Sequence, residues 1–431
     1  MNTAFDRELS YHVERRADRL VAILQSLVRL PSENNAPLGN ELRCQEYIGK
    51  ALSRLGLEVR LYTPAEVPDI ETHPLFWPGR NYENRPNLSA VRKGTGGGRS
   101  LILSGHIDTV PVGASPWTRD PFGAIIEGER LYGRGANDMK GGVATNLFVM
   151  EMLSGLGIEL AGDLFFETVV DEEFGGVNGT LAARLTGHRA DGAVISEPTA
   201  LRVCPAQRGG RTVHITFAAP NNGILGQSAG TGVIEQLRAF LNAVPEFAAL
   251  RKASAPKHPM YSSLADPVPV TVARIQTAAW GTSEPPNVPP VCRVELFWQT
   301  MPGESVERID GEFDAWFNGV IGRNPEVFSV RPEIGYPIRW LNGSALTQDA
   351  EITAEFARCA EVSMGQRPTI AGIEGPCDMY VFHEFGIPAL LWGARGGNTH
   401  VADEYVELDS VVLSAKVLLT FVCKWCGISS K

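Results

Sequence analysis

The sequence predicts an α/β fold in which a larger domain with a mostly parallel sheet carries an inserted smaller domain. Strand-like apolar runs alternate with helix-like runs over residues 1–207 and again over 337–431, which is typical of a sheet covered by helices. Over residues 208–336 the order changes to a self-contained βαββαβ pattern. The 431 residues also exceed what one core of ordinary size holds, which favours two domains.

The first part of the larger domain begins with two amphipathic helices, 18–30 and 40–56, which end at Pro31 and Gly56. Residues 64–86 are rich in proline and polar residues and predict a long loop. Strands and one apolar helix make up the rest of this part: strands 57–62, 87–94, 99–110, 162–173 and 192–198, and helix 141–156.

The inserted domain and the last part of the chain follow from the same periodicities. The expected elements of the inserted domain are strand 211–217, helix 232–244, strands 269–278 and 291–299, helix 305–321 and strand 328–336. The larger domain then resumes with helix 347–364, strand 388–393 and helix 409–423.

The composition is that of an ordinary globular protein, with 44% hydrophobic and 20% charged residues and a net charge of -10. No run rich in lysine and arginine appears, so we expect no nucleic-acid partner. No stretch approaches the ~20 apolar residues that span a bilayer, so we expect no membrane partner. The first 20 residues are charged where a secretory signal would be apolar, which favours the cytoplasm.

Histidine and acidic residues recur where predicted strands end or helices begin. They are His106 and Asp108 in "SGHIDTVP", Asp138 in "GRGANDMKGG", Glu172 and Glu173 in "DEEFGG", Glu197 in "SEPT" and His400 in "GNTHVADEYV". Ligands of open α/β sheets bind at the carboxyl ends of the strands. Imidazole and carboxylate ligands together suit Zn²⁺, Co²⁺ or Mn²⁺. Two histidines and three carboxylates are enough for two ions if one carboxylate bridges them.

In their order along the chain, these five motifs resemble the co-catalytic metallopeptidases, a family that includes acetylornithine deacetylase, succinyl-diaminopimelate desuccinylase, aminoacylase-1 and glutamate carboxypeptidase. The resemblance covers nearly the whole chain. It implies a metal-binding catalytic domain formed by residues 1–207 and 337–431. It also implies a lid and dimerisation domain over 208–336.

The resemblance further implies a role for each residue of the motifs. His106 and Glu197 would bind one metal ion, Glu173 and His400 the other, and Asp138 would bridge the two. Glu172 would act as general acid and base, and Asp108 would orient the imidazole of His106. A cis peptide bond after the bridging aspartate is also implied.

The residues expected to bind substrate depart from the family pattern. Gln227 stands where relatives carry a lid histidine, and Gln299 replaces an arginine that binds a substrate carboxylate. In "GPCDMY", Asp378 is kept but Tyr380 replaces another arginine, whereas Asn287 matches the lid asparagine of the family.

These departures leave two interpretations open. Arg208 and Arg211, in "AQRGGR", would take over the binding of a substrate carboxylate. Alternatively the substrate is flatter and more apolar, and aromatic residues line its site; the candidates are Phe76, Trp77, Trp298 and Tyr380.

We therefore expect a hydrolase of a C–N bond that uses two divalent metal ions per subunit, zinc, manganese or cobalt. The resemblance implies that a hydroxide shared by the ions attacks an N-acyl amino acid or another small amide. Two alternatives stay open: deamination of an aryl amine, a non-amide C–N hydrolysis, on the same metal site, and a relative that binds metal without turnover. The exposed edge strands of the lid domain, which relatives pair, imply a homodimer or a larger homo-oligomer.

Overall fold

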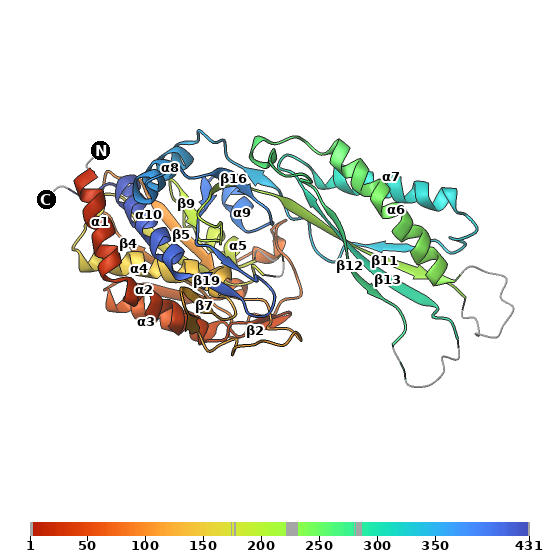
Figure 1. Ribbon diagram of the computed structural model, residues 1–431, viewed down its shortest axis with the longest axis horizontal. Coiled ribbons are helices and arrows are strands. Elements are labelled where there is room, and N and C mark those ends of the chain that lie inside the picture. The colour runs from red at the N-terminus through yellow and green to blue at the C-terminus, as the bar shows by residue number, and fades with distance from the viewer. Residues whose placement is uncertain are drawn as a thin grey trace. The chain divides into compact units, whose positions relative to one another are not determined.

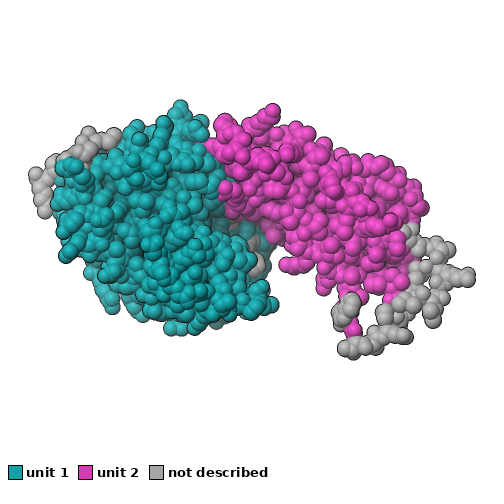
Figure 2. All heavy atoms as spheres, in the orientation of Figure 1, with its two compact units in different colours: residues 1–206, 345–373, 377–431 teal, residues 207–344, 374–376 magenta. Residues whose placement is uncertain are grey.

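The computed structural model describes residues 3–173, 175, 178–220, 232–279, 281 and 287–429. The chain divides into two compact units, shown in different colours in Figure 2: unit 1 comprises residues 1–206, 345–373 and 377–431, and unit 2 comprises residues 207–344 and 374–376. The sequence predicts 208–336 for the inserted domain. Unit 2 extends further because Leu341 and Gly210 exchange main-chain hydrogen bonds, which keep residues up to 344 beside strand β11 (Gly209–Ala218).

Unit 1 is built on a nine-stranded sheet in the order β15-β10-β17-β9-β5-β8-β4-β3, with β16 paired to β10. The strands are β3 (Val59–Tyr62), β4 (Asn87–Arg92), β5 (Leu101–His106), β8 (Leu164–Val169), β9 (Ala193–Ile195), β10 (Val203–Gln207), β15 (Ser344–Ala345), β16 (Ile370–Ile373) and β17 (Ala389–Leu391).

This sheet is mixed, which corrects the prediction of a mostly parallel one. The central strands β17, β9, β5 and β8 pair in parallel. On one side β4 and β3 add antiparallel, and on the other side β10 does so. An α-helix returns the chain before β8, β9 and β17, whereas the fully described links from β3 to β4 and from β9 to β10 contain no α-helix. Parallel neighbouring strands need a crossover of this kind. The alternation of strand-like and helix-like runs in the sequence therefore predicts strand direction correctly only at the centre of the sheet.

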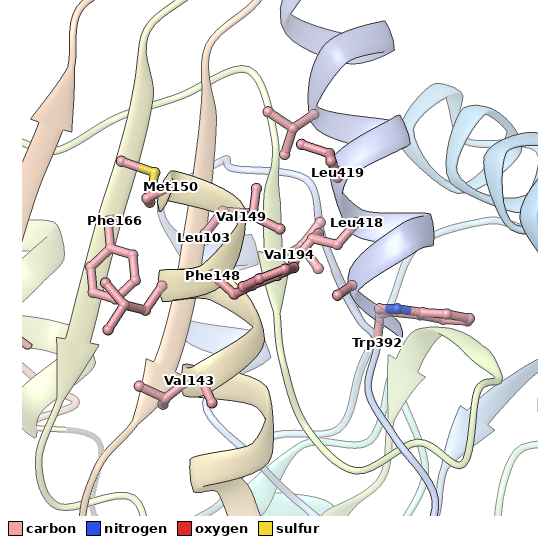
Figure 3. Close-up of a cluster of buried hydrophobic side chains, with 14 of the residues drawn as sticks. Leu103, Val143, Phe148, Val149, Met150, Phe166, Val194, Trp392, Leu418 and Leu419 are labelled. Atoms are coloured by element: carbon pink, nitrogen blue, oxygen red, sulfur yellow. The ribbon is translucent and has the colours of Figure 1, made fainter. Parts of the chain in front are cut away.

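Helices cover both faces of the sheet, and Figure 1 shows α4 and α10 on one of these faces. One face carries α1 (Thr3–Arg15), α2 (Ala17–Val28), α3 (Leu42–Arg54), α4 (Gly141–Gly155), α8 (Glu351–Met364) and α10 (Leu408–Cys426); the other carries α5 (Asn178–Leu185) and α9 (Met379–Glu384). Successive strand residues alternate between these faces. Leu103 and Val194 pack under α4 and α10 (Figure 3), whereas Ile102 and Ile195 pack with α9.

Two small sheets complete unit 1. A hairpin pairs β1 (Asn34–Asn35) with β2 (Leu38–Gly39). A four-stranded sheet has the order β18-β19-β7-β6, formed by β6 (Ile125–Glu127), β7 (Arg130–Tyr132), β18 (Gly396–Gly397) and β19 (Tyr405–Glu407). Because β19 pairs with β7, the segment just after Tyr132 lies beside the segment just before Tyr405.

Unit 2 consists of a four-stranded antiparallel sheet in the order β12-β13-β11-β14 and two long helices. The bounds are β12 (Val270–Gln276), β13 (Val291–Thr300), β14 (Glu333–Gly335), α6 (Val233–Ser254) and α7 (Val306–Arg323). Its core is rich in aromatic side chains. Trp298 is fully buried there, stacked on Phe313 with ring centroids 5.4 Å apart, so this tryptophan belongs to the core and lines no substrate site.

Among the helices that the structure describes, none combines the length and the apolar character needed to cross a bilayer.

Candidate metal centre

Three adjacent parallel strands of unit 1 end beside one another and present ionisable residues. His106 is the last residue of β5, and Glu172 and Glu173 follow β8 by a few residues. Glu197 follows β9 by two residues. Because the carboxyl ends of parallel strands share one edge of a sheet, segments far apart in the sequence converge there.

The imidazole of His106 is held by the main chain of Asp108. Its Nδ1 lies 2.9 Å from the carbonyl oxygen of Asp108, so Nδ1 is the donor and Nε2 faces the cluster. The nearest carboxylate oxygen of Asp108 is farther from Nδ1, at 3.6 Å. This carboxylate instead accepts hydrogen bonds from the main-chain N–H groups of Glu172 and Glu173, at 3.3 and 3.2 Å, and from Asn34 Nδ2 at 2.9 Å.

Asp138 lies between the two histidines. It follows Gly135, which has φ of 79°, and a cis peptide bond joins it to Met139, as the resemblance implies. Its Oδ1 is 3.0 Å from His106 Nε2, and its Oδ2 is 3.3 Å from His400 Nε2. One carboxylate therefore presents each of its oxygens to a different imidazole, which is the arrangement expected of a bridging ligand.

The other acidic residues divide between the two histidines. Glu173 Oε2 lies 2.9 Å from His400 Nε2. Glu197 Oε1 and Glu172 Oε2 lie 3.8 and 3.9 Å from His106 Nε2. Glu197 and Glu172 thus lie beside His106, Glu173 lies beside His400, and Asp138 lies between the two histidines.

Burial and mutual repulsion shift the pKa values of these groups. Burial raises the pKa of Glu172 well above its usual range, and the negative charges of Glu197 and Asp378 raise it further. Burial likewise raises the pKa of Glu197 to about 8 and that of Glu173 to about 7.

The pKa of His400 is raised, although burial alone would lower it. Burial lowers the pKa of His400, but its hydrogen bonds to Asp138 and Glu173 raise it to about 10. Carboxylates crowded together in a region of low dielectric thus favour the protonated, positively charged form of His400.

This set of groups fits divalent metal ions. The ligand atoms of His106, Asp138 and Glu173 lie within 4.8 Å of one another. The side chains of His106 and Glu173 are 1% and 2% exposed, whereas that of His400 is 49% exposed. Buried carboxylates are stable when they are paired or coordinate metals, and mixed imidazole and carboxylate ligands suit zinc, manganese or cobalt.

Of the residues predicted to bind substrate, Asp378 and Tyr380 lie in unit 1, both buried at the start of α9. Asp378 is close enough to raise the pKa values of Glu172 and Glu197, and its Oδ2 accepts a hydrogen bond of 2.5 Å from Thr180. The structure therefore brings Asp378 into the charged cluster.

The other polar candidates belong to unit 2. Arg211 donates to both carboxylate oxygens of Asp310, at 2.8 and 2.5 Å, so its charge already has a partner. Arg208 donates to the carbonyl oxygens of Glu374 and Pro267, at 2.8 and 2.6 Å. Gln299 Nε2 donates to the same carbonyl of Glu374 at 2.7 Å. Asn287 is half-buried, and Gln227 lies outside the described residues.

Sequence reasoning missed several buried residues that support the cluster. Asp171, which precedes Glu172, accepts hydrogen bonds from Arg85 Nη2 at 2.9 Å and from the Tyr82 hydroxyl at 2.7 Å. Glu404 accepts hydrogen bonds from the loop that carries Asp138. The acidic doublet Asp403–Glu404, just after His400, was the only signal for Glu404, and a doublet of this kind is common on surfaces.

The model of Peptidase family M20/M25/M40 matches residues 102–424, well over half of the chain. The chain belongs to this family. The resemblance to succinyl-diaminopimelate desuccinylase is thereby confirmed: the desuccinylase of Methylobacterium nodulans is 33% identical over 216 residues, 48% of this chain and 50% of that protein.

One further relative and one solved structure match the chain almost end to end. N-formyl-4-amino-5-aminomethyl-2-methylpyrimidine deformylase of Halalkalibacterium halodurans is 29% identical over 456 residues, 97% of each chain. The solved di-peptidase Dug1p of Saccharomyces cerevisiae has a TM-score of 0.77 at 13% identity and covers 100% of both chains, which shows a shared fold.

A dinuclear metal-binding M20 peptidase, the YXEP protein of Bacillus subtilis, has the same fold, with a TM-score of 0.61 at 13% identity over 96% of this chain and 99% of its own. The M20 family is metal-dependent, and the two relatives are named as a deformylase and a desuccinylase. The protein is accordingly a metallopeptidase-family hydrolase that acts on amide C–N bonds.

Proposed function

We propose that the protein removes a formyl or other short acyl group from an amine on a flat heteroaromatic substrate that carries no carboxylate. The observation that carries this proposal is the match with the pyrimidine deformylase, which covers 97% of both chains, whereas the desuccinylase matches about half. The proposal keeps the small amide expected from the sequence and replaces the amino-acid part by an amine carried on a heteroaromatic ring.

The substrate-binding positions support a substrate without a carboxylate. Gln299 and Tyr380 stand where amino-acid deacylases are expected to carry arginines, and a neutral amide or phenol gives no bidentate charged contact. Arg211, the candidate substitute, is already bound to Asp310 through both nitrogens of its fork. Arg208 already donates through Nε and Nη1 to two main-chain carbonyl oxygens, which leaves only part of its five N–H donors for a carboxylate.

Hydrolysis would add water across the amide bond, with hydroxyl to the acyl carbon and a proton to the nitrogen. We assign His106 and Glu197 to one ion, His400 and Glu173 to the other, and Asp138 to both, following the distances above. The two ions, when bound, supply a polarised carbonyl and water of lowered pKa.

Glu172 would move the proton. It is next to Glu173 in sequence, and its carboxylate lies 3.9 Å from His106 Nε2, so it reaches the same place without being needed as a ligand. Burial raises the pKa of Glu172, so its carboxylate form is a stronger base that can take a proton from water, and the acid so formed can give that proton to the leaving amine.

The test is a product assay on metal-loaded protein. The panel holds a formylated aminomethylpyrimidine, N-acetyl and N-succinyl amino acids, and electron-poor aryl amines. We expect formate from the pyrimidine, little release from the amino acids, and a loss of about 10²–10⁴-fold in kcat for Glu172→Gln with its metal content unchanged.

Two outcomes would overturn the proposal. Faster turnover of N-acyl amino acids would restore the amino-acid substrate and the role of Arg208. Ammonia released from an aryl amine, with no formate from the pyrimidine, would support the non-amide alternative on the same metal site.

A further inference from the structure

The carboxylate of Glu404 is 1% exposed and accepts four hydrogen bonds from one short segment, residues 134–138. Its Oε1 accepts from the main-chain N–H groups of Asn137 at 2.9 Å and Asp138 at 3.0 Å. Its Oε2 accepts from the main-chain N–H of Gly135 at 2.9 Å and from Nη1 of Arg134 at 2.7 Å. Three main-chain groups and one guanidinium thus converge on one side chain.

The backbone of this segment is shaped for an anion. Gly135 has φ of 79°, and Asp138 departs from helical geometry with φ of -120° and ψ of 100°. N–H groups that converge in this way form a concavity that binds negative charge. A carboxylate filling it makes charge-assisted hydrogen bonds, which are about twice as strong as neutral ones.

The same contacts join the loops of two candidate ligands. Glu404 follows His400 by four residues. The loop that carries both residues also accepts a hydrogen bond of 2.8 Å from Asn137 Nδ2, through the hydroxyl of Thr399. Arg134 Nη2 donates to the carbonyl of Val401 at 3.3 Å. These hydrogen bonds join residues 134–138 to residues 399–404, and they therefore help to set the separation of Asp138 and His400.

We propose that Glu404 is a positioning residue that fixes the backbone at Asp138, so that the two oxygens of Asp138 face two metal ions. The inference rests on the metal centre proposed above. It assigns to Glu404 no contact with an ion or with substrate. It requires both oxygens of Glu404 to be acceptors, because each receives two donors.

Glutamine at this position cannot reproduce that pattern. A side-chain amide has one acceptor oxygen and one NH₂ donor. In either orientation the NH₂ group faces two donors: the N–H groups of Asn137 and Asp138, or the Arg134 guanidinium and the N–H of Gly135. Glu404→Gln therefore displaces one half of the segment, and the orientation of Asp138 changes with it.

The experiment titrates metal-free protein with Co²⁺ and follows its visible absorption, which requires no substrate. For Glu404→Gln we expect the affinity of at least one of the two sites to fall by about 10–100-fold, the range found when supporting partners of metal ligands are removed. Glu404→Asp keeps the negative charge but is one methylene shorter, so it separates geometry from charge. We expect Glu404→Asp to weaken binding as well.

Glu304→Gln is the matched control. Glu304, in unit 2, is also buried, and its Oε2 accepts from Arg251 Nη2 and from the main-chain N–H of Met301, both at 2.8 Å. We expect this variant to lose thermal stability without any change in Co²⁺ affinity.

Folded Glu404→Gln or Glu404→Asp protein that binds two Co²⁺ ions with wild-type affinity would overturn the inference alone. Wild-type protein that binds no Co²⁺ would instead overturn the metal centre. If Glu404→Gln does not fold, Glu404→Asp decides the question.

Discussion

At the scale of single residues, main-chain contacts hold the side chains of the candidate metal centre. His106 Nδ1 lies 2.9 Å from the carbonyl oxygen of Asp108, whose carboxylate accepts hydrogen bonds from the main-chain N–H groups of Glu172 and Glu173. His106, Asp138, Glu173, Glu197 and His400 lie close together, and the order of their motifs along the chain is the signal that singled them out in the sequence. The sequence does not predict that His106 contacts the main-chain oxygen of Asp108 rather than its carboxylate. Differences of about 1 Å in atomic position decide which hydrogen bond forms.

The Asp108 carboxylate gives a prediction at this scale. Asp108→Asn would place an NH₂ group against the main-chain N–H of Glu172 or, in the other orientation, against the main-chain N–H of Glu173 and the amide of Asn34. We expect kcat to fall by about 10–100-fold with a small change in KM, because the turn that carries Glu172 loosens.

Asp163→Asn is the control for this variant. Asp163 also accepts a main-chain hydrogen bond, from Gly94 at 2.8 Å, and pairs with Lys93, but its side chain is 31% exposed. Steady-state kinetics of the two variants decide the matter. Equal losses of kcat in the two variants would mean that the Asp108 carboxylate does not position the turn that carries Glu172 and Glu173.

At the scale of elements, the predicted strands are confirmed where the apolar runs are long. The predicted parallel direction is confirmed only for the central strands, which α-helices connect. The buried strands β5 and β8 lie within their predicted ranges. The antiparallel direction of β4 and β10 was missed because composition does not encode which neighbour a strand pairs with. Helix α6 extends ten residues beyond its predicted end at 244, and Pro245 inside it explains the early stop.

The packing of α4 against the strand ends gives a second prediction. A Cβ on Gly142, in the first turn of α4, would lie 1.9 Å from the main-chain oxygen of Ser196, the residue before Glu197. We expect Gly142→Ala to lower the free energy of unfolding by about 1–3 kcal/mol, because a buried backbone must shift.

Urea unfolding of unit 1 measures this loss, and Gly49→Ala in α3 is the control. There the added Cβ would meet only Leu88 and Val59 at 3.5 Å, an ordinary contact, and alanine favours a helix by up to ~1 kcal/mol. A Gly142→Ala protein as stable as Gly49→Ala would show that the strand ends are not packed as tightly as described.

At the scale of the whole molecule, assembly stays a prediction. In unit 2, β12 is an edge strand of the sheet, and its Ile275 is 46% exposed. Native proteins cover or protect such edges. We expect light scattering to give twice the mass of one chain, and we expect Ile275→Asp to shift the mass toward that of one chain. A wild-type protein with the mass of one chain would contradict the predicted homodimer.

The two-metal centre is the claim on which the account depends, and metal content tests it most directly. Protein freed of metal by a chelator and reloaded separately with zinc, manganese or cobalt is dialysed, and metal ions per chain are counted by elemental analysis. We predict two ions per wild-type chain, fewer for Asp138→Asn, and amide hydrolysis that disappears with the chelator and returns with the ions. A wild-type chain that retains no ion, or an Asp138→Asn chain that retains two with unchanged affinity, would contradict the account.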